Sequence, residues 1–374
     1  MNDLHLCFIL DSYPPAIGGA ETALQNICEG LAQRNFDVTV ITAWFGGNEP
    51  VIEKSEGLTV VRLRIPRLLR RFWFVQQAIP AILRYARNSD IVVGSTYGGV
   101  LPAFLGSILL KKKRVMMVHE VMRHRWFRFE KNPLKAFFYY LTEKILIRLP
   151  FQRVVAVSEY TRNELLHMGM NDEAIDVIYH GMPDGGARPI RNRDEVRTSL
   201  GFGKGDFLYL AFGRLGVTKG FQYLARAIPE IIRQVPQARF LLIFFDYDRR
   251  IRREIGEALV KVTSNSYKLF DSVPRELLID YIHAADCVVI PSLSEGFGFA
   301  ALEACAAGTP LVATKAGALP EVVYGRHVLV EPASVEQLSE GCRRVFEGRT
   351  LYSEPKDFRW ETSIEKWEIM FRSL

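Results

Sequence analysis

The chain has 374 residues, of which 48% are hydrophobic and 24% are charged, and its formal net charge is +6. This length exceeds one ordinary hydrophobic core and predicts two domains of roughly 150 to 200 residues each. The composition is globular and excludes a repetitive or largely disordered chain. No helix-turn-helix, zinc-finger or RNA-recognition signature accompanies the positive charge, which argues against nucleic acid as a partner.

Short apolar runs alternate with helical periods through the first half of the chain. The expected strands are LHLCFIL, DVTVIT, LTVVRL, DIVVG, RVMMVH, RVVAVS and AIDVIYHG. The expected helices cover about 20–34, 75–87, 100–110 and 134–149, with a further helix at YTRNELLHM. This order predicts a parallel sheet with helices on both faces.

The stretch from 182 to 205 is rich in glycine, proline and arginine, which is typical of a connection between domains. We therefore expect a boundary near Pro183, with an N-terminal domain over 1–183 and a second domain over 184–354. The second half repeats the alternation, with strands at DFLYLAFG, ARFLLIFF, YKLF, DCVVIPS, PLVAT and HVLVE and helices at about 220–234, 249–262, 275–284, 299–306 and 335–346. The expected fold is α/β, two Rossmann-like domains facing a central cleft, with ligands at the carboxyl ends of the strands.

The cysteines and the apolar runs suggest a location in the cell. None of the cysteines has CxxC spacing, so we expect buried thiols in a reducing compartment; they are Cys7, Cys28, Cys287, Cys305 and Cys342. The N-terminus enters a strand without a basic leader, and the best apolar run, LPAFLGSILL, is too short to span about 30 Å of hydrocarbon. These features predict a cytoplasmic protein, with peripheral attachment to a membrane as an open alternative.

Two segments of the first half interleave arginine and lysine with aromatic residues and leucine. They are Arg62–Trp73 and Arg123–Tyr140. This pattern is typical of a segment that lies on an anionic bilayer surface. A solvated basic face whose aromatic residues point inward explains the pattern equally well.

Two loops of the first half carry candidate site residues. Gly18 and Gly19 lie between the first strand and the first helix, where backbone amides can approach a phosphate. A tight strand-to-helix turn is the simpler alternative. His119 ends the strand RVMMVH, where it can bond a sugar hydroxyl or serve as a core histidine.

Two loops of the second half carry charges. FGRLGVTKG places Arg214 and Lys219 between a strand end and a helix start, where two cations can clamp a diphosphate. Asp246 and Asp248 form the D-x-D pattern of metal-dependent sugar-nucleotide enzymes. The basic run that follows them favours a helix start with acids ahead of bases, and no metal is expected.

The segment SEGFGFAALEACAAG holds two carboxylates around a glycine-aromatic repeat. GFGFAA has the outline of a dinucleotide fingerprint, which would indicate a nicotinamide enzyme. The following strand lacks the acidic residue for an adenosine ribose, however, and a polar SLSE precedes the glycines. In the alternative interpretation Gly296–Gly298 pass under a phosphate or sugar, Glu303 binds both ribose hydroxyls and Glu295 binds a sugar.

Together these motifs resemble the retaining glycosyltransferases of family 4, which have the two-domain GT-B fold. The resemblance covers nearly the whole chain and rests on GGAE, VHE, AVSEYTRNEL, YHG, GRLGVTKG, the two glutamates with seven residues between them that include GFG, and the closing FRWETSIEKWEIMF. It implies that residues 355–374 form a C-terminal helix that crosses back to the first domain.

The resemblance also implies roles for individual residues. Glu295 contacts the donor sugar, and His119 lies near the reacting carbon; these two are the expected catalytic residues. The expected donor-binding residues are Gly18, Gly19, Arg214, Lys219, Gly296, Phe297, Gly298 and Glu303. Neither a cofactor nor a divalent metal is implied. The chain departs from the family at FFDYD, at Asp271 and at His180, and the first two departures leave the nucleobase open.

The sequence thus predicts a retaining transferase that moves a hexose from a UDP-sugar or GDP-mannose to a hydroxyl acceptor. A lipid-linked or surface glycan is the expected acceptor, because the basic aromatic segments suggest a nearby membrane. A sugar-nucleotide epimerase or a phosphorylase of the same fold is the main alternative, and an NAD-dependent oxidoreductase is a more distant one.

Overall fold

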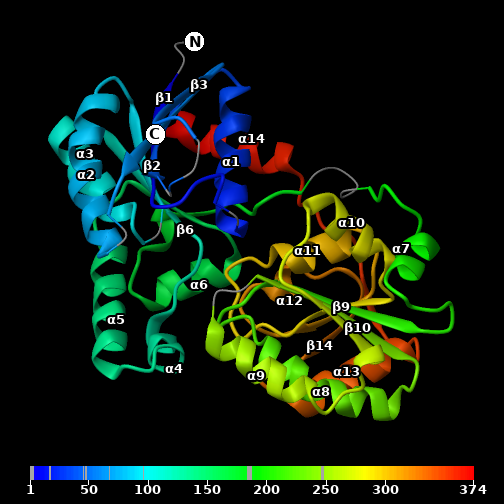
Figure 1. Ribbon diagram of the computed structural model, residues 1–374. Coiled ribbons are helices and arrows are strands. Elements are labelled where there is room, and N and C mark those ends of the chain that lie inside the picture. The colour runs from blue at the N-terminus through cyan, green and yellow to red at the C-terminus, as the bar shows by residue number, and fades with distance from the viewer. Residues whose placement is uncertain are drawn as a thin grey trace. The chain divides into compact units, whose positions relative to one another are not determined.

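The computed structural model describes residues 4–16, 18–44, 46, 49–66, 68–95, 97–182, 188–245 and 248–374. The chain divides into two compact units (Figure 1). Unit 1 consists of Met1–Gly181 together with Phe358–Leu374, and unit 2 is Met182–Asp357. The boundary expected at Pro183 lies outside the described residues.

Unit 1 is built on an eight-stranded sheet in the order β3-β4-β2-β1-β5-β6-β7-β8. Every pair in it is parallel except β3 with β4. The predicted parallel sheet is confirmed, but the edge strand β3 is new, because its four exposed residues form no apolar run. The strands are β1 (His5–Leu10), β2 (Asp37–Trp44), β3 (Ile52–Ser55), β4 (Leu58–Arg64), β5 (Ile91–Ser95), β6 (Lys113–Val118), β7 (Arg153–Ala156) and β8 (Ile175–Val177).

The helices of unit 1 include one from the far end of the chain. They are α1 (Gly19–Ala32), α2 (Arg70–Tyr85), α3 (Val100–Leu110), α4 (Trp126–Phe129), α5 (Pro133–Ile147), α6 (Glu159–His167) and α14 (Trp360–Ser373), with 3-10 turns η1 (Arg123–Arg125) and η2 (Asp172–Ala174). In α14, Trp367 is fully buried, and the Phe371 ring lies 6.3 Å from that of Phe8 in β1. The C-terminal helix therefore completes the core of the first unit, as the resemblance implied.

Unit 2 has a seven-stranded sheet in the order β11-β10-β9-β12-β13-β14-β15. Its edge strand β15 is antiparallel to β14, and all other pairs are parallel. β15 was not predicted, since it is short and mostly exposed. The strands are β9 (Phe207–Arg214), β10 (Ala238–Phe245), β11 (Tyr267–Phe270), β12 (Cys287–Ile290), β13 (Leu311–Thr314), β14 (Gly325–Val330) and β15 (Leu351–Ser353).

The segment expected to be a plain connection contains a helix, α7 (Arg193–Ser199). Asn192 caps it by accepting a hydrogen bond from the amide of Glu195 at 2.9 Å, and Val196 is fully buried. A seven-residue helix is too short to show periodicity, which is why it could not be recognised in the sequence. The other helices of unit 2 are α8 (Phe221–Gln234), α9 (Arg249–Leu259), α10 (Arg275–Ala284), α11 (Phe299–Ala306), α12 (Leu319–Val322) and α13 (Val335–Phe346), with the 3-10 turn η3 (Ser264–Ser266).

Both faces of the unit 2 sheet are covered, which is why its central strands are continuously apolar. In β9, Tyr209 and Ala211 pack into one core, while Leu208 and Leu210 pack into the core on the opposite face. The strand order reverses between β1 and β5 in unit 1 and between β9 and β12 in unit 2. In open sheets of this kind, ligands bind at that switch point, outside the carboxyl ends of the strands.

Candidate functional site

The loops that follow β9 and β12 meet at the switch point of unit 2. The amide of Leu293, after β12, donates to the carbonyl of Thr218, after β9, at 2.6 Å. Gly220 precedes α8 with a φ of +69°, and a Cβ there would lie 2.0 Å from the carbonyl oxygen of Pro291. Only glycine allows the two loops to approach so closely, so the backbone itself fixes their register.

Lys219 and Glu295 form an ion pair across these two loops. The Lys219 Nζ lies 2.7 Å from Glu295 Oε1, and the Ser292 hydroxyl donates to the same oxygen at 2.8 Å. The Glu295 side chain is 10% exposed and that of Lys219 is 30% exposed. A mostly buried carboxylate thus holds a cation that still reaches solvent.

Glu303 lies in the second turn of α11, the helix that follows the glycine loop. Its side chain is 13% exposed and pairs with Arg275 of α10 at 2.5 Å. Burial raises the pKa of the Glu303 carboxyl, and the nearby Arg275 guanidinium only partly opposes this effect. A buried carboxylate with a raised pKa and a specific charged partner is a common feature of functional sites.

The remaining predicted residues of unit 2 surround these two acids. Arg214 is the last residue of β9 and is exposed. Gly296, Phe297 and Gly298 are buried. Gly298, which adopts the left-handed conformation, is the N-cap residue of α11. The structure thus brings all the predicted residues of the second half to the loops and helix starts at one edge of one sheet.

The switch point of unit 1 is built in a similar way, from the loops after β1 and β5. A Cβ on Gly99 would lie 2.0 Å from the carbonyl oxygen of Ile9, and one on Gly98 would lie 2.6 Å from the Asp11 side chain. Gly18 and Gly19 begin α1 at this edge, and a Cβ on Gly18 would meet the Glu21 carboxylate at 2.2 Å. The two glycine pairs therefore lie at the starts of the two helices next to the switch point, α1 and α3.

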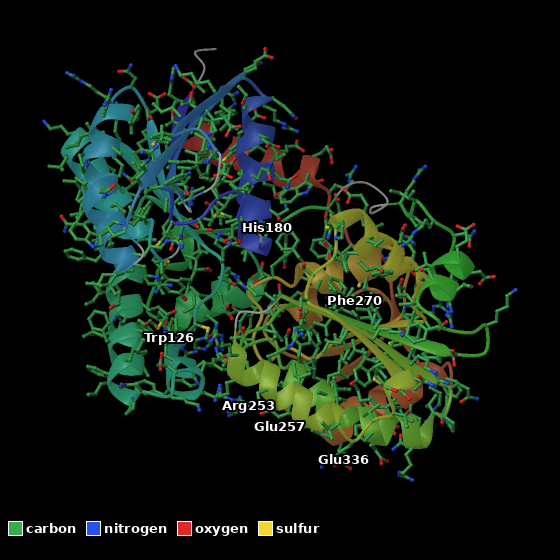
Figure 2. The ribbon with its side chains drawn as sticks, in the orientation of Figure 1. Trp126, His180, Arg253, Glu257, Phe270 and Glu336 are labelled. Atoms are coloured by element: carbon green, nitrogen blue, oxygen red, sulfur yellow. The ribbon has the colours of Figure 1, made fainter. Side chains whose placement is uncertain are left out.

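His119 lies just after β6 at the same edge. Its Nε2 is 3.1 Å from the Ser95 hydroxyl at the end of β5, and its ring stacks on that of His180 with centroids 5.6 Å apart. The ring of His180, labelled in Figure 2, in turn lies 6.2 Å from that of Trp360, which begins α14. Burial lowers the pKa of His119 to about 4, so the imidazole is neutral at pH 7.

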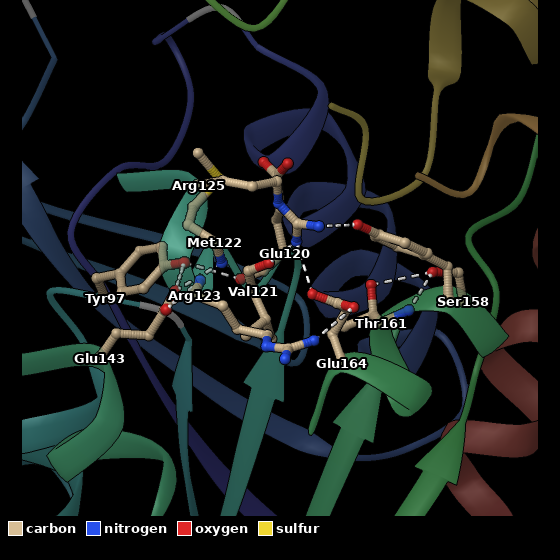
Figure 3. Close-up of polar contacts among 11 residues, drawn as sticks. Tyr97, Glu120, Val121, Met122, Arg123, Arg125, Glu143, Ser158, Thr161 and Glu164 are labelled. Carbon is tan, nitrogen blue, oxygen red and sulfur yellow. Dashed lines mark hydrogen bonds and ion pairs between the residues drawn. The ribbon is translucent and has the colours of Figure 1, made fainter. Parts of the chain in front are cut away.

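The loop after His119 is fixed by a buried network of acids and arginines (Figure 3). Glu143 of α5 accepts hydrogen bonds from the Tyr97 hydroxyl at 2.7 Å and from the backbone amides of residues 122 and 123 at 2.8 and 2.7 Å. Glu164 of α6 pairs with Arg123 at 3.2 Å and with Arg125 at 2.8 Å. The loop that follows His119 is therefore held by one acid of α5 and one acid of α6.

The D-x-D candidate divides between described and undescribed residues. Asp248 caps α9, and its side chain accepts from the amides of Arg250 at 2.9 Å and Ile251 at 3.2 Å. This bonding agrees with the helix-start interpretation of Asp248, whereas Asp246 lies outside the described residues. The described ranges hold no cluster of three or more histidine, cysteine or acidic side chains arranged to bind a metal. All five cysteines are buried free thiols, as expected.

Sequence reasoning missed several residues at these edges. Arg275 could not be identified from the sequence as a partner of Glu303, because only the fold brings α10 beside α11. Gly98 and Gly99 carried a usable signal, since a glycine pair between a strand and a helix repeats the pattern of Gly18 and Gly19. Tyr97 and Glu143 gave no local signal, because their hydrogen bond joins residues 46 positions apart.

Two family descriptions match the chain in succession. Residues 17–184 match Glycosyltransferase Family 4, and residues 192–361 match Glycosyl transferases group 1. The chain belongs to the family 4, group 1 glycosyltransferases. The match to both units agrees with the motif order that indicated this family.

Relatives and solved structures agree with the assignment of this chain to the glycosyltransferase family. An uncharacterized glycosyltransferase of Methanocaldococcus jannaschii is 26% identical over 363 residues, covering 91% of this chain and 89% of its own. Sucrose-phosphate synthase from Thermosynechococcus elongatus has a TM-score of 0.78 at 19% identity, with 99% and 98% of the two chains covered. Anabaena HepE in complex with UDP-glucose has a TM-score of 0.76 at 19% identity, with 99% and 100% covered. These two structures share the GT-B fold with this chain.

As a family 4 glycosyltransferase, the chain uses a nucleotide sugar. The candidate residues divide into two groups, one in each unit. Gly18, Gly19 and His119 belong to unit 1, and the cations, acids and glycine loop belong to unit 2. The unit 2 group combines cations, backbone amides and carboxylates, which are the chemistries that a diphosphate and sugar hydroxyls require.

Proposed function

We propose that this glycosyltransferase moves a hexose from a nucleoside diphosphate hexose to a hydroxyl acceptor, with retention of the anomeric configuration. The observation that carries the proposal is the pair of Lys219 and Glu295 at the switch point of unit 2. It places an ammonium group for a diphosphate and a carboxylate for sugar hydroxyls 2.7 Å apart. The pair also keeps the cation positioned before a donor arrives.

The donor spans the loops of unit 2 in this proposal. Lys219 and Arg214 bind the diphosphate, and the loop from Gly296 through Phe297 to Gly298 passes beneath the phosphate and sugar. Glu303 accepts hydrogen bonds from the ribose hydroxyls, and Glu295 accepts them from the hexose. Arg275 opposes the effect of burial and so favours the charged form of Glu303, which matters because both oxygens of a carboxylate accept hydrogen bonds only in that form.

The chemical step breaks the bond between the anomeric carbon and the β-phosphate oxygen. The acceptor oxygen forms the new bond on the same face, and its proton passes to the departing phosphate oxygen. The two cations stabilise the charge that develops on the diphosphate, so no metal is needed. For unit 1, the family resemblance suggests that Gly18 and Gly19 contact a phosphate and that neutral His119 bonds a sugar hydroxyl.

A turnover assay with purified protein tests this function. UDP, GDP and ADP are first screened by thermal shift, because a ligand present at a hundred times its dissociation constant stabilises the native state by about 2.7 kcal/mol. The matching sugar nucleotide is then incubated with a hydroxyl acceptor, and the product is examined by NMR. We expect release of the nucleoside diphosphate and a product with the donor's anomeric configuration. An inverted product, or epimerised donor without transfer, would contradict the proposal.

The acceptor proposed for this reaction is a lipid-linked or surface glycan at the cytoplasmic face of a membrane. In the described part of the chain, no helix has the length and hydropathy to span a bilayer. Large apolar side chains are nonetheless exposed in the first unit, including Leu69 at 68% and Phe138 at 64%. Exposed apolar groups beside cations suit a peripheral contact with lipid, which would bring the enzyme to such an acceptor.

A further inference from the structure

The cations of the two basic aromatic segments do not all reach the surface. The Arg62 side chain is 7% exposed and pairs with Glu53 at 2.8 Å. Arg123 and Arg125 both pair with Glu164, whose side chain is 10% exposed. These three arginines form ion pairs within unit 1, so we look for the membrane contact among other residues.

Helix α5 carries its apolar stripe on the outside. Its buried residues are Ala136, Glu143, Leu146 and Ile147. The large apolar side chains that face solvent recur every three or four residues, which places them on one side of the helix. They are Leu134 at 80%, Phe137 at 55%, Phe138 at 64%, Leu141 at 40% and Ile145 at 55% exposed. This arrangement is the reverse of an ordinary surface helix, whose apolar face is covered by the core.

The fold holds this stripe outward. Asn132 caps α5 by accepting hydrogen bonds from the amides of Leu134 at 3.0 Å and Lys135 at 3.2 Å, and Pro133 occupies the first turn. Glu143, on the opposite side, is anchored by its three hydrogen bonds to Tyr97 and the loop after His119. The helix therefore cannot roll to bury its apolar side without breaking a buried carboxylate network, which is costly.

Basic residues border the stripe. Residues 127–148 contain five cations and two acids. One of the acids, Glu143, points inward, and the other, Glu130, pairs with Lys135 at 2.9 Å. The exposed cations are Arg128, Lys131, Lys135 and Arg148. The surface that α5 offers is thus apolar along its middle and positive at its borders.

We propose that α5, together with Phe127 of α4, lies on an anionic phospholipid bilayer, with the apolar stripe among the acyl chains and the cations at the headgroups. Phe127 of α4 is 48% exposed, and its ring lies 6.1 Å from that of Tyr140 in α5, so it adds an exposed aromatic side chain beside that helix. The inference deepens the proposed membrane-side acceptor and depends on it for its biological meaning. The membrane contact proposed here is thus one face of α5, and not the whole of the two basic aromatic segments.

Charge favours lipid over a second copy of the chain as the occupant. A symmetric dimer through α5 would bring the same basic borders together, and like charges in contact are unfavourable. Anionic headgroups complement these borders. Exposed aromatic residues are also concentrated in one unit. Of the six described phenylalanine and tryptophan side chains that are exposed, five lie in unit 1.

Vesicle sedimentation with the full-length protein tests this surface. We expect the protein to pellet with vesicles containing about a third phosphatidylglycerol, and not with pure phosphatidylcholine. About 1 M salt should release much of it, because the Debye length falls to about 3 Å. The double variant Phe137→Ser/Phe138→Ser should lose at least about tenfold in vesicle partition, since both rings leave the apolar phase.

The control is Val260→Ser, which removes an 85% exposed apolar side chain from unit 2 and should leave partition unchanged. Thermal unfolding and sedimentation velocity of each protein show whether it is folded and monomeric. Equal partition of the wild type and a folded Phe137→Ser/Phe138→Ser variant would overturn the proposal. So would a wild type that ignores anionic vesicles, or a dimer that dissociates in the variant. Transfer by the wild type to a water-soluble acceptor without vesicles separately tests the proposed function, so failure of one does not imply failure of the other.

Discussion

The two units share one architecture, but the carboxyl edges of their sheets carry different chemistry. At the switch point of unit 2 the polar side chains are ion pairs, Lys219 with Glu295 and Arg275 with Glu303. At the edge of unit 1, His119 bonds the Ser95 hydroxyl and stacks on His180. The same fold therefore presents charges on one sheet and an uncharged histidine pair on the other.

The pKa shifts of unit 1 sharpen this contrast. Burial lowers the pKa values of His119 and His180, and it raises those of Asp11 and Tyr97. Each of these shifts favours the uncharged form of the group. The difference agrees with the proposal that Lys219 and Arg214 of unit 2 bind the donor diphosphate and that neutral His119 of unit 1 bonds a sugar hydroxyl.

The largest expected effect comes from α14, the last helix of the chain, which belongs to unit 1 and not to unit 2. Trp367→Ala should destabilise unit 1 by about 3–5 kcal/mol, because a fully buried indole leaves a cavity. Native-state hydrogen exchange should show loss of protection in β1 and β2, with β9 and β10 less affected. Ile369→Ala, at a residue 61% exposed on the same helix, is the matched control. Equal loss of protection in both units would show that they unfold together.

The next effect tests the charged edge of unit 2. Lys219→Ala should lower kcat/KM for the sugar nucleotide by about a hundred- to a thousandfold, because one preorganised charge partner of the leaving group is removed. Steady-state release of the nucleoside diphosphate measures the loss. Lys204→Ala is the control, since this side chain is 89% exposed and its ion pair with Asp194 is 3.6 Å long. A Lys219 variant that turns over donor at the wild-type rate would remove the central residue of the proposed site.

Much of the fold could be predicted, because long apolar strands and periodic helices can be recognised from the local sequence alone. The helix at α3 was predicted with the bounds that the structure shows, Val100–Leu110. The failures are elements without such a signal: β3 is wholly exposed, and α7 is shorter than two full periods. Local pattern is strong where burial is strong, and weak at edges and connections.

The candidate site divides in the same way. Glycine pairs and cations between a strand and a helix could be found in the sequence, because the carboxyl edge of a parallel sheet follows from chain order. Arg275 and Glu143 could not, since their partners are distant in the chain. The basic segments show the opposite failure: their charge was evident, but no local pattern distinguished buried Arg62 from exposed Lys131.

A smaller effect tests the neutral edge of unit 1 through pH. The pKa of His119 is lowered from 6.5 to about 4, so its stabilising effect is complete above pH 6.5 and is lost as pH falls towards 4. From these values, moving from pH 7.5 to pH 5 costs about 2 kcal/mol. His119→Gln, which cannot titrate, should lose less stability over this range. Urea unfolding at both pH values measures the difference, with exposed His124→Gln as the control. Identical losses in the wild type and the His119 variant would mean that this histidine is charged in the native state.

The smallest expected effect concerns Glu303, a buried acid in the charged edge. Its raised pKa means that its contribution to stability is complete below the pKa of the unfolded chain and is lost as pH rises. Glu303→Gln should therefore raise Tm slightly at pH 7, and the gain should shrink towards pH 4. The same variant should bind the nucleoside diphosphate more weakly, because an amide offers one acceptor oxygen where the carboxylate offers two. Glu257→Gln, at an acid 70% exposed on α9, should change neither property. A Glu303 variant that loses Tm while binding nucleotide normally would make this carboxylate a structural partner of Arg275 instead of a group held for the ribose.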